Sequence, residues 1–171
     1  MGAAEKKSRC PRAPRLCYSA APTPLLMKLH WLTEAQMDDT IALLSYLNPN
    51  VPAATLRERY EKIMHEHTNY RVLGAFIKGR LVGLTGIWHG TKLWCGDYME
   101  VDNLVVHPDY RGKGIASSLM ERVNELAKEA GCNIEVLDSY TTNYPSHRIY
   151  QSKGFEIWGF HFIKPLRDFE H

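Results

Sequence analysis

The residues best suited to chemistry lie in residues 105–120, where the sequence reads "VVHPDYRGKGIASSLM". An apolar run, a basic bend and an amphipathic run follow one another, which predicts a strand that leads into a helix. A helix start presents unpaired backbone N–H groups, and Gly112 and Gly114 let a ligand approach them closely. Arg111 and Lys113 add positive charge beside the bend. The stretch therefore predicts a site for a phosphorylated ligand.

Two common phosphate-binding motifs fit this bend poorly. The Walker motif requires a lysine after its last glycine, whereas Gly114 is followed by Ile115. A dinucleotide-binding fingerprint fits in part, because Ser117 stands where its third glycine belongs and Asp138 ends the next predicted strand. That fold needs several further βα units after the first, and we expect too little chain after the bend to form them.

The elements around the bend indicate the fold class. A strand at residues 98–106, a helix at residues 115–130 and a strand at residues 132–137 form a predicted βαβ unit. Its strands should be parallel, and its crossover should be right-handed. We therefore expect an α/β (α+β) fold with this unit at its centre.

The rest of the chain supplies the outer elements. A capping-box pattern at Thr33 starts one predicted helix, and Pro52 starts another. A glycine turn at residues 78–80 joins two β-rich runs into an antiparallel hairpin. A short helix at residues 146–152 and a β-type run at residues 155–166 follow the central unit.

Composition limits the class of protein. With 171 residues, 44% hydrophobic and 23% charged, the chain fits one globular domain. No apolar run reaches the roughly 18 residues that a membrane-spanning helix needs, so we expect no membrane partner. The net charge of +2 arises in residues 1–26, which hold five basic residues and one acid, and the remainder is slightly acidic. This charge distribution disfavours nucleic acid as a partner.

The N-terminal segment and the cysteines bear on processing and compartment. Residues 1–26 are rich in Ala, Pro and Arg and lack periodicity, so we interpret them as an extension, leader or tail. Residues 27–171 would then form the domain. The four cysteines lack CxxC spacing, which predicts neither a zinc site nor a disulfide framework. We interpret them as free thiols in a reducing compartment, and expect a cytoplasmic protein.

Two motifs together resemble a known family. Arg111, Gly114 and Ala116 match the signature of the GNAT superfamily of acyl-CoA-dependent N-acetyltransferases. The later stretch "NYPSHRIYQSKGF" resembles the second motif of that family. The resemblance extends from residue 28 to about residue 164 and is strongest over residues 98–155.

The resemblance implies a fold and a co-substrate. The fold would be a mixed central sheet of about six or seven strands with about four helices. The sheet would splay between the strand at 98–106 and the strand at 132–137, and the pantetheine of acetyl-CoA would lie in the gap. The backbone that would bond the pantetheine belongs to Leu104, Val105 and Val106. The residues whose N–H groups would hold the diphosphate are Arg111, Gly112, Lys113, Gly114, Ile115, Ala116 and Ser117.

The resemblance also implies catalytic roles. Tyr150 occupies the position of the general acid that protonates the departing CoA thiolate. Asn143 would bond the cofactor or a water near it. An amine acceptor must lose a proton before it attacks, and the expected base is Asp102 or, second, Glu100. If neither acts as base, both orient the acceptor's ammonium group.

Other chemistry-bearing residues are less informative. Trp88, Trp94 and Tyr98 either wall the acceptor pocket or pack in the core. The histidines show no metal-ligand spacing, so we expect no metal.

We therefore expect an N-acetyltransferase that moves the acetyl group of acetyl-CoA directly to a primary amine of a small molecule, such as a polyamine, an aminoglycoside or an amino-acid-like acceptor. The alternatives are a protein or peptide N-acetyltransferase, a non-catalytic acyl-CoA-binding or sensing module on the same fold and, more distantly, a nucleotide-dependent oxidoreductase. The family generally ends in a two-strand hairpin, whereas residues 155–166 offer one run that could break at Gly159. A partner chain could supply the missing wall, so a homodimer is an option.

Overall fold

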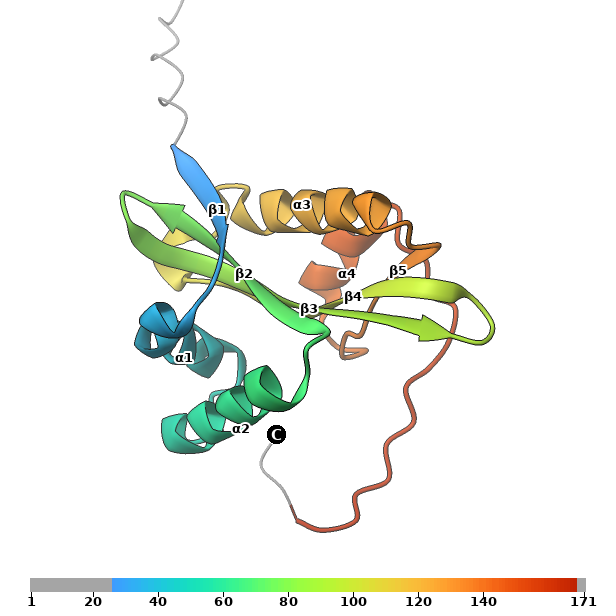
Figure 1. The fold of residues 1–171 in the computed structure, drawn as a ribbon, viewed down its shortest axis with the longest axis horizontal. Helices are drawn as coiled ribbons and strands as arrows, with labels where there is room; N and C mark the ends of the chain where they lie inside the picture. The colour runs from blue at the N-terminus through green and yellow to red at the C-terminus, as the bar shows by residue number, and fades with distance from the viewer. Residues whose placement is uncertain (1–25, 169–171) are drawn as a thin grey trace, which may run out of the picture.

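A five-stranded sheet forms the centre of the protein, in a computed structural model that describes residues 26–168 (Figure 1). The order is β1-β2-β3-β4-β5, and every neighbouring pair is antiparallel except β4 and β5, which are parallel. The strands are β1 (Met27–Trp31), β2 (Tyr70–Ile77), β3 (Arg80–Lys92), β4 (Gly96–Val106) and β5 (Ile134–Leu137). All of the predicted N-terminal extension except its last residue lies outside the described residues.

Helices cover the two faces of the sheet. Figure 1 shows α1 and α2 on one side and α3 on the other. The helices are α1 (Met37–Leu47), α2 (Ala53–Glu66), α3 (Ile115–Glu129) and α4 (Tyr144–Ser152), with 3-10 turns at Glu34–Gln36 and Pro108–Tyr110. None of the described helices combines the length and the apolar composition needed to cross a bilayer.

Successive strand residues alternate between two cores. Val72 packs with the residues of α1 and α2, whereas its neighbour Leu73 packs with those of α3. This alternation is the period of two that a strand imposes on its side chains. The α3 core includes Leu119 and Val123, both fully buried, from the helical stripe predicted from the sequence. The predicted α/β class and central βαβ unit are therefore confirmed.

The predicted first hairpin forms around a tight turn. Lys78 and Gly79 have φ angles of 51° and 79°, and they join β2 to β3. Two consecutive positive φ angles are typical of the turn whose twist matches that of paired strands. The turn and a β-bulge between Ala75 and Phe76 together set the register that places Tyr70 opposite Trp88.

The strand count is lower than predicted. Residues 155–166 have no strand or helix, although their sequence favours a strand. A β-type sequence forms a strand only when a neighbour pairs its backbone, and no described segment pairs with these residues. The expectation of six or seven strands is therefore wrong for the described residues, which form five. The large apolar side chains left exposed there are Ile157, Trp158, Phe160, Phe162, Ile163 and Leu166.

The sheet splays where the resemblance implied. Pairing between β4 and β5 ends at Val101 and Leu137. The remaining residues of β4, 102–106, have no strand beside them on the β5 side within the described chain. Backbone groups on that side are available to an extended ligand, as at any open strand edge.

Candidate active site

A β-bulge in β4 adjoins the splay. Leu84 lies opposite Val105, and Gly86 opposite Asp102, so β4 carries one more residue than β3 between these pairs. Asn103 has a φ of 51°, a left-handed conformation that asparagine tolerates. A bulge bends its strand and redirects the side chains beside it. Here the bend falls immediately after the last pair that β4 makes with β5.

The carboxylate of Asp102 is held by three donors at this bend. The Tyr70 hydroxyl and the Trp88 Nε1 lie 3.4 Å from Asp102 Oδ2, and Asn103 Nδ2 lies 2.6 Å from it. Burial raises the pKa of Asp102, and hydrogen bonds from these side chains offset the rise only in part. The result is a fixed carboxylate that is a stronger base than an exposed aspartate.

Tyr70 reaches Asp102 across β3 because position 86 is glycine. A Cβ added at Gly86 would overlap the Tyr70 hydroxyl. The Tyr70 ring also packs on Trp88 at a centroid distance of 4.4 Å, and Trp88 meets His67 edge-on at 5.1 Å. Burial raises the pKa of Tyr70, so its hydroxyl keeps its proton and remains a donor. Neither Tyr70 nor His67 carried a motif that could have revealed its role in the sequence.

A second carboxylate, Glu100, lies on the same strand two residues before Asp102. Burial is the main cause of the raised pKa of Glu100. The negative charges of Asp138 and Asp102 raise this pKa further, and the positive charges of Lys92 and His161 lower it. His161 Nδ1 lies 2.7 Å from Asp138 Oδ2. The structure thus brings the two predicted carboxylates near a third that follows β5. His161 had no predicted role.

The phosphate-binding bend is open at its glycines. Gly112 and Gly114 have φ angles of 73° and 80°, in the left-handed region that glycine adopts without strain. Nothing lies within 4 Å of a Cβ built on either glycine. Gly114 is the N-cap of α3, and no side chain caps this end of the helix. The first N–H groups of α3 can therefore donate hydrogen bonds to an anion.

The two basic residues of the bend fold onto the bend itself. Arg111 Nε donates to the Val106 carbonyl at 3.2 Å, and its backbone N–H donates to the Pro108 carbonyl at 3.2 Å. Lys113 Nζ donates to the Asp109 carbonyl at 2.8 Å. Because the N–H of Arg111 already has a partner, the donors left for a diphosphate begin at Gly112.

These features fit the predicted acyl-CoA. Leu104, Val105 and Val106 lie on the part of β4 that β5 leaves unpaired. Ile115, Ala116 and Ser117 form the first turn of α3, beside the open glycines. An extended ligand with a diphosphate matches a free strand edge followed by an uncapped helix start.

Tyr150 and Asn143 come from α4. The half-buried Tyr150 packs on Phe155 at a centroid distance of 6.2 Å. Burial raises the pKa of Tyr150, and a hydrogen bond with Ser146 lowers it in part, so the phenol stays protonated at neutral pH. Asn143 is the N-cap residue of α4, but its side chain makes no capping bond and stays available. Among the described residues, no hydrogen bond or ion pair joins Tyr150 to Glu100 or Asp102.

Other predicted residues lie elsewhere. Of the three aromatics considered for the acceptor pocket, Trp88 contacts Asp102, whereas Trp94 is 65% exposed beyond the end of β3. The Tyr98 ring lies 4.2 Å from Lys92 Nζ. Within residues 26–168, no three His, Cys, Asp or Glu side chains are grouped so that they could hold a metal ion.

Known proteins share this fold. Residues 31–155 match the sequence profile of the acetyltransferase (GNAT) family. The chain is similar to aminoalkylphosphonate N-acetyltransferase of Salmonella typhimurium, with 28% identity over 145 residues, 81% of this chain and 91% of the relative. Two solved structures share the fold alone. The aminoglycoside N-acetyltransferase AAC(6')-Iy in complex with CoA has a TM-score of 0.73 at 19% identity, covering 86% of this chain and 99% of that one. The ribosomal-protein-alanine N-acetyltransferase of Brucella melitensis has a TM-score of 0.70 at 21% identity, covering 82% and 99%.

Replacing Gly114 should separate anion binding from stability. Gly114→Ala places a Cβ in the open space of the bend and forces a left-handed alanine, which costs about 1–2 kcal/mol of stability. Gly131→Ala is the matched control, because Gly131 also has a positive φ of 73° and open space around its Cβ, at the other end of α3. Thermal unfolding should show similar losses for both. Calorimetry should show weaker CoA binding for Gly114→Ala only; equal affinities would contradict the role of the bend.

Removing a donor from Asp102 should shift the pH dependence of turnover. The Trp88 hydrogen bond lowers the pKa of Asp102, so Trp88→Phe should raise that pKa further. A base works only when deprotonated, so the acidic limb of kcat/KM should move to higher pH. Trp94→Phe, at an exposed tryptophan, should leave the limb in place. An unmoved limb in Trp88→Phe would exclude Asp102 as the titrating base.

Proposed function

The chain belongs to the acetyltransferase (GNAT) family and is an acetyl-CoA-dependent acyltransferase, and from this premise we propose that its acceptor is a primary amine of a small molecule. The observation that carries the proposal is the half-buried, hydrogen-bonded Asp102 carboxylate at the splay. It supplies a base where an acceptor can meet a ligand that lies along β4.

Asp102 would activate the amine. A primary amine is mostly an ammonium ion at neutral pH and cannot attack until it loses a proton. The raised pKa of Asp102 lessens the mismatch with the ammonium, so the transfer to the carboxylate, directly or through water, becomes less unfavourable. Tyr70 and Trp88 fix the carboxylate, so the base is positioned before the acceptor arrives.

Tyr150 would supply the second proton. Bound acetyl-CoA supplies a thioester, whose acetyl group is activated toward an amine and whose thiolate departs. The Tyr150 hydroxyl keeps its proton at neutral pH because burial raises its pKa, and it can donate that proton to the thiolate. Backbone N–H groups from Gly112 to Ser117 would hold the diphosphate, while Leu104, Val105 and Val106 would bond the pantetheine.

The charges around the site favour a cationic acceptor. The like charges of Asp138 and Asp102 raise the pKa of Glu100, whereas the positive charges of Lys92 and His161 lower it. A concentration of negative charge attracts ammonium groups and raises their local concentration. This supports polyamines, aminoglycosides and other small amines. A peptide N-terminus carries the same ammonium group and is the alternative that the experiment must separate.

A thiol-release assay tests the proposal. Full-length protein with acetyl-CoA should release CoA thiol when a small amine is added, and a panel should include polyamines, aminoalkylphosphonates, aminoglycosides, amino acids and peptides. We expect the highest kcat/KM with a small multivalent amine. A higher kcat/KM with peptides would identify the protein as a peptide acetyltransferase. If calorimetry detected no CoA binding, the proposed CoA site would be wrong.

Tyr150→Phe should separate catalysis from binding. Losing a general acid typically lowers turnover by about 10²-fold or more, while CoA affinity should change little. Tyr144→Phe is the matched control, because Tyr144 is an exposed tyrosine on the same helix. Initial rates and calorimetry on both variants measure the two effects. Full turnover in Tyr150→Phe would assign that tyrosine to packing against Phe155 instead.

A further inference from the structure

The helix that carries Tyr150 is only weakly held by apolar packing. None of the nine residues of α4 is buried, and none belongs to either apolar core of the described chain. The helices α1, α2 and α3, in contrast, each bury several side chains. An element with few buried apolar contacts opens at a low cost in free energy. The position of Tyr150 therefore depends on individual links between α4 and the rest of the protein.

The last turn of α4 joins Tyr150 to Lys153. The Tyr150 carbonyl accepts from the N–H of Lys153 at 3.0 Å and from the N–H of Phe155 at 3.1 Å. Gly154, with a φ of 90°, turns the chain out of the helix between these two donors. Tyr150 and Lys153 are three residues apart, so their side chains lie on neighbouring positions of one helix face. A contact that holds Lys153 therefore also holds the turn that carries the Tyr150 phenol.

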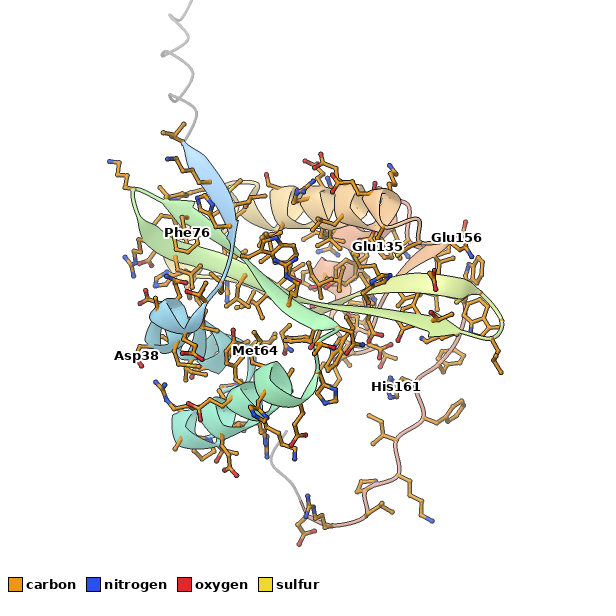
Figure 2. All side chains as sticks on the ribbon, in the orientation of Figure 1. Asp38, Met64, Phe76, Glu135, Glu156 and His161 are labelled. Atoms are coloured by element: carbon orange, nitrogen blue, oxygen red, sulfur yellow. The ribbon has the colours of Figure 1, made fainter. Side chains whose placement is uncertain are left out.

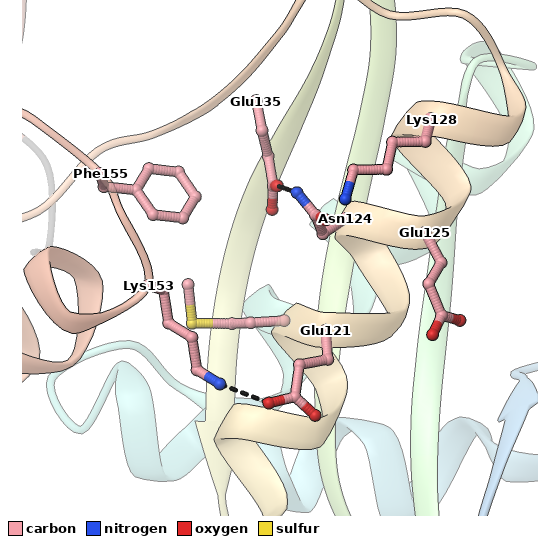
Figure 3. Close-up of a pocket in the computed structure, with 8 residues that line it drawn as sticks. Glu121, Asn124, Glu125, Lys128, Glu135, Lys153 and Phe155 are labelled. Carbon is pink, nitrogen blue, oxygen red and sulfur yellow. Dashed lines mark hydrogen bonds and ion pairs between the residues drawn. The ribbon is translucent and has the colours of Figure 1, made fainter.

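A hollow of about 430 Å³ separates the end of α4 from α3 and β5. Glu135, labelled in Figure 2, lines the hollow from β5. Figure 3 shows Lys153 and Phe155 reaching into it from the chain at the end of α4, and Glu121 facing them from α3. The side chains of the two helices thus meet across this hollow.

One ion pair crosses the hollow from α4 to α3. Lys153 Nζ donates to Glu121 Oε1, the contact drawn as a dashed line in Figure 3. The Lys153 side chain is only 25% exposed, so solvent screens this pair less than it screens a fully exposed one. The apolar contact that Phe155 makes in the hollow is non-directional. A hydrogen-bonded ion pair, in contrast, favours one geometry and fixes the end of α4 at one point.

We propose that Lys153 is a positioning residue for the acetyl transfer: its ion pair with Glu121 holds the end of α4 against α3 and directs the Tyr150 hydroxyl to the gap beside β4. The inference rests on the proposed role of Tyr150 as general acid. The helix α3 begins at Gly114, in the bend that would hold the diphosphate. The ion pair therefore fixes the proton donor relative to the same helix that positions the ligand.

Turnover at saturating substrate tests the role of Lys153. The assay uses full-length protein, acetyl-CoA and the amine with the highest kcat/KM in the thiol-release panel. Lys153→Met keeps the apolar stem and loses the charge, so kcat should fall about fivefold. The calorimetric affinity for CoA should change little. Lys153→Glu faces Glu121 with a like charge, so kcat should fall about tenfold or more.

Three further variants identify the ion pair as the cause. Glu121→Gln breaks the pair from its exposed side, where the side chain is 62% exposed, and should reproduce the loss of Lys153→Met. The exchanged pair, Lys153→Glu with Glu121→Lys, should restore most of kcat. Lys128→Met is the matched control: Lys128 lines the same hollow but lies on α3 itself, so it cannot link α4 to that helix. Its kcat should stay unchanged.

Two measurements distinguish this inference from the proposed role of Tyr150. In the Tyr150→Phe background, Lys153→Met should cause no further loss of kcat, because Lys153 acts through the missing hydroxyl. Hydrogen exchange of residues 144–155 should be faster in Lys153→Met than in the unmodified protein, whether or not an acceptor is present. Full turnover in Tyr150→Phe would disprove the general-acid role. Full turnover in Lys153→Glu, with turnover lost in Tyr150→Phe, would overturn only the positioning role.

The remaining outcomes are equally decisive. A raised KM for acetyl-CoA at unchanged kcat would assign Lys153 to ligand binding and overturn the inference. An equal loss in Lys128→Met would mean that the charge of the hollow matters and the link does not. An exchanged pair that failed to recover kcat would exclude the ion pair. Thermal unfolding of each variant checks that the body of the protein still folds.

Discussion

The early end of pairing between β4 and β5 is the constraint on which the site depends. After Val101 the two strands separate, and the bulge at Asn103 bends β4 at the same place. Thr85, fully buried beneath the bulge, donates from its hydroxyl to the Asp102 carbonyl at 3.0 Å and stabilises the distortion. If β4 and β5 stayed hydrogen-bonded beyond Val101, the gap beside β4 would be closed. Without the bulge, Asp102 would keep the regular pairing of a flat strand.

The features fixed by neighbouring residues could be predicted from the sequence. The open bend follows from Gly112 and Gly114, because only their left-handed conformations allow this path into α3. The buried face of α3 follows from the helical spacing of Leu119 and Val123. The splay was implied by resemblance to a family, since no local pattern says where two strands separate. The roles of Tyr150 and Asn143 remain predictions, although burial of the phenol suits the first.

The features that arise between distant segments could not be predicted. Tyr70 meets Asp102 only because the hairpin register, the bulge and the lack of a side chain at Gly86 combine. The pairing of His161 with Asp138 likewise joins separate segments. The strand predicted for residues 155–166 was wrong for the described chain for the same reason. Composition shows that a segment favours strand structure, but it does not provide the neighbour.

The half-buried carboxylate of Asp102 has a thermodynamic consequence for the whole fold. Because its pKa is raised in the folded state, folding favours the protonated acid, and this contribution is complete only below the ordinary range of aspartate. It is lost as the pH rises through the raised value, and above that value the ionised group weakens the native state. Selection for heat tolerance alone would favour a neutral side chain at this position. Keeping an aspartate at position 102 therefore limits the free energy of unfolding, and a neutral replacement would remove that limit together with the proposed base.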